Sequence, residues 1–273
     1  MTEIIAIGLN TFREAIRNKV LYLILMFAVL LIGSSIFLST LALEEGMRVV
    51  KNLGLSSINV FGLLVAMFIG VNLIPQEVES KTIYTIISQG VRRWQFVLGK
   101  FLGLTLTVYA NIAIMSLLLL AIMFWMLGGF THPVETLSDR SFLWIPAAIG
   151  MQLFEMLIVI SIAILFSSFS TPILSAVMTL MVYVIGNMTN DFWDYIRLQS
   201  EKGGNEVFCG VLTFIWYLCP HLDLLNLKKL AVYFELLPAA QTYFPFIPAV
   251  LHALTYTAIV LFLACTAFSK RDF

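Results

Sequence analysis

The chain has 273 residues, of which 60% are hydrophobic and 12% are charged, and its formal net charge is zero. Soluble domains carry about 25% charged residues, so this composition excludes an ordinary soluble domain and indicates a protein that lies in lipid. A neutral chain gives no reason to expect a nucleic-acid partner. Backbone polar groups must pair internally within a bilayer, and the apolar runs here are continuous rather than alternating. We therefore expect an all-α integral membrane protein built as a bundle of spanning helices.

The first residues of the chain, 1–19, have the pattern of an amphipathic helix rather than of a span. Arg13 and Arg17 lie off a stripe of apolar side chains that recur at helical spacing. We expect this segment to lie in the plane of the cytoplasmic membrane interface, with the arginines toward the lipid headgroups. A plain basic flank of the first span is the alternative. The stripe consists of Ile5, Leu9, Phe12, Ile16 and Val20.

Six segments are apolar over a length that can cross a membrane, which takes about 20 residues. A further apolar run, Val207–Cys219, is too short to span comfortably, and we interpret it as a re-entrant or interfacial segment. The whole chain, 1–273, is then expected to form a single transmembrane domain. The predicted spans are 20–43, 57–75, 97–127, 142–167, 172–190 and 247–268.

The distribution of Lys and Arg predicts the orientation of the bundle. With the N-terminus inside, nine basic residues near the span ends lie on the cytoplasmic side and seven on the other. Four of those seven belong to the long segment 191–246, where each has less influence, so the short segments divide nine against three. Both termini are therefore expected in the cytoplasm, with 76–96 as a cytoplasmic loop. Segment 191–246 is expected outside, with re-entrant pieces, as a solvated cap or else as an exit gate or a contact for a periplasmic partner.

The loop 76–96 concentrates charge between two apolar spans. Pro75 is expected to close the second span, and Glu77 and Glu79 suit the positive N-terminus of a short helix that follows it. Three isoleucines give that helix an apolar face, which either the lipid interface or a cytoplasmic partner must bury. The isoleucines are Ile83, Ile86 and Ile87, and the basic residues of the loop are Lys81, Arg92 and Arg93.

Two single features of the spans are also informative. Gly99 and Gly103 open the third span as a GxxxG pair, which would let another helix approach closely. Glu155 lies in the middle of the fourth span, where a charge costs roughly 2.5–3.5 kcal/mol on insertion scales. We expect its side chain to face the bundle interior or water, or to be protonated. An interhelical tie is the favoured role, and a place on a substrate or ion path is the alternative. The expected partners for the tie are Asn72, Asn111 and Asn187.

Motifs for catalysis or nucleotide binding are missing from the sequence. There is no GxxxxGK[ST] phosphate loop, no HExxH and no GxSxG, and neither the histidines nor the cysteines show metal-ligand spacing. We therefore expect a protein that is not an enzyme and that binds no metal or cofactor itself. If the protein performs work, the energy comes from an ion gradient or from a partner.

The order of these elements resembles the permease subunit of a type-2 ATP-binding-cassette exporter. In that family an amphipathic N-terminal helix precedes six spans, and a cytoplasmic coupling helix lies between spans two and three. The link Leu165–Ala176 resembles the family's polar connection between spans four and five, and Tyr217–Tyr233 resembles its short re-entrant helices between spans five and six. The residues that match the coupling helix are Glu77, Glu79, Lys81-Thr82-Ile83, Arg92-Arg93 and Gly99-Lys100.

The resemblance implies partners and a location. Two separate cytoplasmic ATPase subunits, which bind ATP and Mg, would contact the coupling helix, and a second permease copy or a paralogue would pair with this chain in the inner membrane. The implied function is export of an unidentified substrate. A non-transporting scaffold or a mechanical-transmission subunit of such a complex is the alternative. A gradient-driven carrier is less favoured because no internal repeat is evident.

Overall fold

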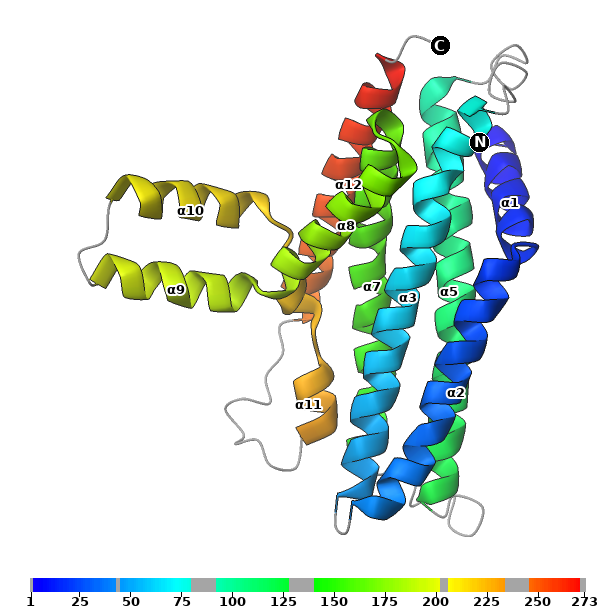
Figure 1. Ribbon diagram of the computed structural model, residues 1–273, viewed down its shortest axis with the longest axis vertical. Helices are drawn as coiled ribbons and strands as arrows, with labels where there is room; N and C mark the ends of the chain where they lie inside the picture. The colour runs from blue at the N-terminus through cyan, green and yellow to red at the C-terminus, as the bar shows by residue number, and fades with distance from the viewer. Residues whose placement is uncertain are drawn as a thin grey trace.

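A computed structural model of the protein describes residues 2–42, 45–79, 92–127, 140–201, 206–233 and 246–270. Within those residues the regular structure is entirely helical and no strand occurs. Long helices run side by side as a bundle, and α9 and α10 project sideways from it (Figure 1). The helices are α1 (Thr2–Ile16), α2 (Lys19–Leu41), α3 (Gly46–Glu79), α5 (Arg93–Met126), α7 (Arg140–Phe169), α8 (Pro172–Asn187), α9 (Thr189–Glu201), α10 (Glu206–Leu218), the 3-10 helix η1 (Leu222–Leu225), α11 (Lys228–Tyr233) and α12 (Phe246–Ser269).

Five of the six predicted spans correspond to single helices of sufficient length and hydropathy, namely α2, α3, α5, α7 and α12. The remaining one, 172–190, covers α8 and the start of α9, which meet at an angle of 64°. Because α8 has 16 residues, it is about 24 Å long and falls short of the hydrocarbon core. The described residues thus contain five helices that are long and apolar enough to cross a membrane, or up to seven candidate spans if two bent helix pairs each count as one. The count of six stays a prediction.

The bend between α8 and α9 is held by Asp223 of η1. Its carboxylate accepts hydrogen bonds from the Thr189 hydroxyl at 3.2 Å and from the backbone N–H of Asn190 at 3.1 Å. The first N–H groups of a helix have no intrahelical partner, and a negative charge suits this positive end. On the other side of the bend, a Cβ at Gly186 would lie 2.7 Å from the carbonyl oxygen of Pro220. The bend is therefore made by tertiary contacts, which a hydropathy window cannot detect.

The helix that contains the second predicted span does not end at Pro75: α3 continues through this residue to Glu79. A proline lacks the N–H that would bond to the carbonyl four residues earlier, which here belongs to Val71. The hydroxyl of Ser167 on α7 donates a hydrogen bond to that carbonyl oxygen at 3.0 Å. The neighbouring helix thus satisfies the acceptor that proline leaves open, as is common in spans.

The predicted coupling helix begins at Glu77 and ends at Gly90, so most of it falls on residues 80–91. This segment, with Lys81, Ile83, Ile86 and Ile87, lies outside the described residues, so the helix stays a prediction. The structure does differ from the sequence-based expectation for Glu77 and Glu79. Both lie in the last turn of α3 rather than in the first turn of a separate helix, because α3 runs past Pro75.

Helix α1 is separate from α2 and packs against the start of α5. The contact is made by small residues: a Cβ at Gly103 would lie 2.5 Å from the carbonyl oxygen of Gly8, and a Cβ at Gly99 would lie 2.7 Å from the Cβ of Ile7. The GxxxG pair of α5 therefore receives α1. The apolar stripe of α1 is not used in this contact, and Ile5 and most of its other members are exposed.

Candidate functional site

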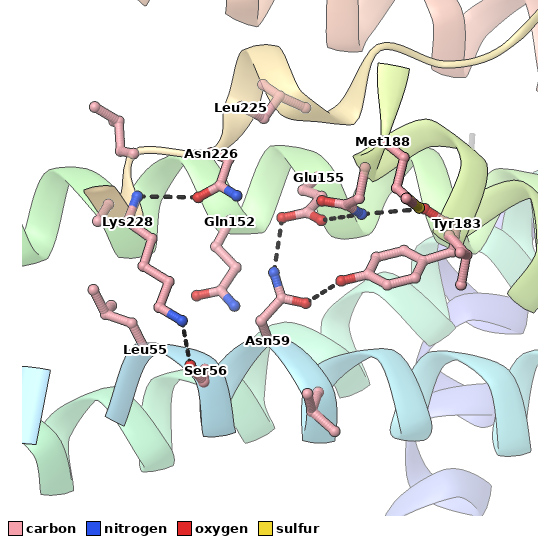
Figure 2. A pocket seen from close by; sticks show the side chains of 15 residues that line it. Leu55, Ser56, Asn59, Gln152, Glu155, Tyr183, Met188, Leu225, Asn226 and Lys228 are labelled. Atoms are coloured by element: carbon pink, nitrogen blue, oxygen red, sulfur yellow. Dashed lines mark hydrogen bonds between the residues drawn. The ribbon is translucent and has the colours of Figure 1, made fainter. Parts of the chain in front are cut away.

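A pocket of about 370 Å³ lies between α3, α7, α8 and the segment that links η1 to α11 (Figure 2). Four sections of the chain that are far apart in sequence meet here, so the pocket exists only in the folded bundle. Its wall combines apolar side chains with amides, a phenol, a carboxylate and an ammonium. The lining residues are Leu55, Ser56, Asn59, Val60, Ala148, Gln152, Glu155, Tyr183, Val184, Asn187, Met188, Leu225, Asn226, Leu227 and Lys228.

Glu155 is the carboxylate of this pocket, and only 2% of its surface is exposed. One of its oxygens, Oε2, accepts a hydrogen bond from the Nδ2 of Asn59 at 3.0 Å. The other, Oε1, accepts from the Nδ2 of Asn187 at 3.3 Å. The hydroxyl of Tyr183 donates to the Oδ1 of Asn59. Through this network Glu155 on α7 ties α3 to α8 (Figure 2).

Of the three asparagines expected beside Glu155, the structure brings only Asn187 to it. Asn72 and Asn111 instead donate to backbone carbonyl oxygens of their own helices, at 2.8 Å and 3.0 Å. Asn59 takes their place. Its side chain interrupts the apolar run of the second predicted span, so its polarity was a usable signal that the sequence reasoning did not weigh.

Lys228 brings a positive charge to the same pocket. It is the first residue of α11, where its backbone N–H bonds to the side-chain oxygen of Asn226 at 3.1 Å. Its half-buried side chain extends to α3, and the Nζ donates a hydrogen bond to the Ser56 hydroxyl. Gln152 lies between Lys228 and Glu155 in Figure 2. The sequence reasoning missed Lys228 because nothing local connects η1 and α11 with α3.

A second group of charged residues gathers where α1, α5 and α12 meet. The Nη1 of Arg93 donates to the carbonyl oxygen of Ser269 at 2.7 Å, which binds the start of α5 to the end of α12. A cation at a helix C-terminus satisfies a free carbonyl and suits the negative end of the dipole. The buried Nζ of Lys100 lies 3.9 Å from the carboxylate of Glu14 on α1. The start of α5 is thereby joined to both terminal helices.

The remaining predicted site residues are placed as follows. Arg92 precedes α5 and is exposed, and its backbone N–H bonds to the side-chain oxygen of Gln95 at 2.9 Å. Arg13 and Arg17 are exposed at the C-terminal end of α1, on the same side as Glu14. No cluster of three or more His, Cys, Asp or Glu residues that could hold a metal ion occurs in the described part of the chain.

Comparison with known protein families gives one match over almost the whole chain. A family described as "ABC-2 family transporter protein" matches residues 5–273, which include every helix except the first three residues of α1. The curated proteins contain no match.

Proposed function

The chain belongs to the ABC-2 transporter family and is a multi-pass membrane subunit of such a transporter; from this premise we propose that it is the permease of an ATP-driven exporter. Two separate cytoplasmic ATPase subunits would hydrolyse ATP, and a second permease copy or a paralogue would complete the transmembrane part. Both termini would lie in the cytoplasm of a cell whose inner membrane holds the complex.

The single observation that carries the proposal is the family match over residues 5–273. The sequence adds support because it contains no phosphate loop, so the nucleotide site belongs on another chain. The fold adds support as well. The start of α1, the start of α5 and the end of α12 lie at one end of the bundle (Figure 1), and Arg92, which directly precedes α5 there, is exposed.

The arrangement also suggests how a push at that end would be transmitted. Segment 80–91 joins α3 to α5, and the start of α5 is bonded to α12 through Arg93 and to α1 through Lys100. A displacement of the segment would therefore act on α3 and α5 directly and on α1 and α12 through α5. Transport requires a bundle with two states that bind the ATPase pair differently. The Glu155 network, which ties α3, α7 and α8, would rearrange between those states.

Purification of the tagged chain in mild detergent, followed by mass spectrometry, tests the proposal. A co-purifying cytoplasmic ATPase with a phosphate loop is the expected result. Arg92→Glu should weaken its recovery because this side chain is exposed and the described hydrogen bonds of Arg92, with Gln95 and Phe96, are made by its backbone N–H and carbonyl oxygen. Arg93 is a poorer choice because its guanidinium also holds Ser269. Transport by the chain in vesicles that lack any ATPase would contradict the proposal.

A further inference from the structure

The pocket around Glu155 holds an acidic and a basic side chain that do not pair with each other. The Glu155 carboxylate accepts hydrogen bonds from the neutral amides of Asn59 and Asn187, and the Lys228 ammonium donates to the neutral hydroxyl of Ser56. Neither charged side chain forms a salt bridge within the described residues. A charge removed from water is costly unless an opposite charge compensates it. Each of the two groups therefore favours a charged partner from outside the chain.

The two side chains contact α3 at positions about one helical turn apart. Lys228 contacts Ser56 and Glu155 contacts Asn59, and these two α3 residues are separated by an advance of about 4.5 Å. Gln152 precedes Glu155 by one turn of α7 and lies between the charges (Figure 2). Its side-chain amide can both donate and accept, and it makes no hydrogen bond within the described residues.

Both charged groups retain hydrogen-bonding capacity for a ligand. A carboxylate has about four lone-pair sites, and two hydrogen bonds reach Glu155. An ammonium has three N–H donors, and the Lys228 side chain uses one of them on Ser56. The pocket volume of about 370 Å³ leaves room for a small molecule between them.

We propose that this pocket binds a small zwitterion, with a primary ammonium beside Glu155 and a phosphate or carboxylate beside Lys228. A simple cation would leave Lys228 without an opposite charge, and a simple anion would leave Glu155 without one. A zwitterion with a short linker compensates both and places its middle beside Gln152. The inference rests on the proposed function only in taking this ligand as the class of transported substrate, because binding itself needs no ATPase.

Two sources supply this chemistry: a soluble aminophosphate or amino acid, and the headgroup of an aminophospholipid. The rim of the pocket carries exposed apolar side chains, Val60, Val184 and Met188. These side chains are suited to contact with a lipid chain but do not exclude a soluble ligand. The experiment therefore needs one arm for each source.

The soluble arm uses glycerophosphoethanolamine and its two halves, ethanolamine and glycerol phosphate, in calorimetric titrations of the purified chain. Since a charge-assisted hydrogen bond is worth about one order of magnitude in affinity or more, the zwitterion should bind at least about tenfold more tightly than either half. Glu155→Gln and Lys228→Gln should each abolish this advantage. Lys229→Gln is the matched control, because the neighbouring lysine is exposed and does not line the pocket.

The lipid arm compares the thermal stability of the chain in nanodiscs of phosphatidylethanolamine and of phosphatidylcholine, whose quaternary ammonium has no N–H donor. Higher stability in phosphatidylethanolamine, lost in Lys228→Gln but not in Lys229→Gln, identifies the lipid source. If Glu155→Gln fails to fold, Lys228→Gln and the comparison of glycerophosphoethanolamine with ethanolamine and glycerol phosphate still test the proposal. Absence of the zwitterion advantage in both arms overturns the inference, whether or not an ATPase co-purifies.

Discussion

Substitution of Gly103 by alanine tests whether α1 is docked on α5 as closely as the structure shows. The added Cβ would lie 2.5 Å from the carbonyl oxygen of Gly8 and 2.6 Å from the Cβ of Thr11. Neither atom is the end of a flexible side chain, so the clash can be removed only if α1 moves away from α5 as a rigid body. Overpacking of this kind costs roughly 1–3 kcal/mol.

The matched control is Gly33→Ala in α2, where an added Cβ meets no atom within 4 Å. Both substitutions share the gain of about 0.5–1 kcal/mol that alanine has over glycine in a helix. The difference between their unfolding free energies therefore reports the cost of the clash between α1 and α5. At roughly 2–4 °C per kcal/mol for a chain of this size, the midpoint of thermal unfolding should be about 2–12 °C lower for Gly103→Ala than for Gly33→Ala. The assay is differential scanning fluorimetry in one detergent.

A second measurement distinguishes separation of α1 from α5 from a general loss of stability of the bundle. Because the start of α5 follows segment 80–91, Gly103→Ala should also reduce stimulation of the partner ATPase, and Gly33→Ala should not. Equal unfolding midpoints for the two variants would refute the close contact between α1 and α5 and the mechanical connection drawn from it.

Two further substitutions probe the interior of the bundle. Glu155→Leu leaves the half-buried amide of Asn59 without its acceptor, at about 1–3 kcal/mol, and leaves Asn187 with the Tyr183 carbonyl oxygen as its one remaining acceptor. It should therefore lower the unfolding midpoint more than Glu155→Gln, which keeps a side-chain oxygen; similar midpoints would contradict the interhelical tie. Ser167→Ala removes the donor to the Val71 carbonyl and should cost about 1 kcal/mol or more. Ser161→Ala is its control, because that hydroxyl bonds within its own helix, to the carbonyl of Ile158, and an equal loss of stability would show that Ser167 does not compensate Pro75.

The spans could be predicted because length and hydropathy are local properties of the chain. The same reasoning misjudged Pro75, since the group that supports a helix through it, Ser167, lies 96 residues from Val71 in sequence. It also gave no sign of the 64° bend within 172–190, where Asp223 caps a new helix at Thr189. Long-range hydrogen bonds of this kind leave no periodic pattern.

The candidate site was predictable only in its centre. A carboxylate in an apolar span is conspicuous. The free-energy cost of placing it in the bilayer was enough to predict that Glu155 has a polar partner such as an asparagine. Lys228 could not be expected in the pocket, because its side chain reaches the pocket only when η1 and α11 pack near α3. The GxxxG pair of Gly99 and Gly103 indicated a close helix contact, and only the fold identifies α1 as the partner.

The central claim, that a separate ATPase drives this permease through segment 80–91, is tested most directly by ATP hydrolysis in proteoliposomes. The chain and the co-purified ATPase are reconstituted together, with wild-type permease or with a variant in which 80–91 is replaced by a flexible Gly/Ser linker of equal length. We expect the wild type to alter the hydrolysis rate of the ATPase and the linker variant, inserted at the same level, to have lost that effect. Full stimulation by the linker variant would contradict the account.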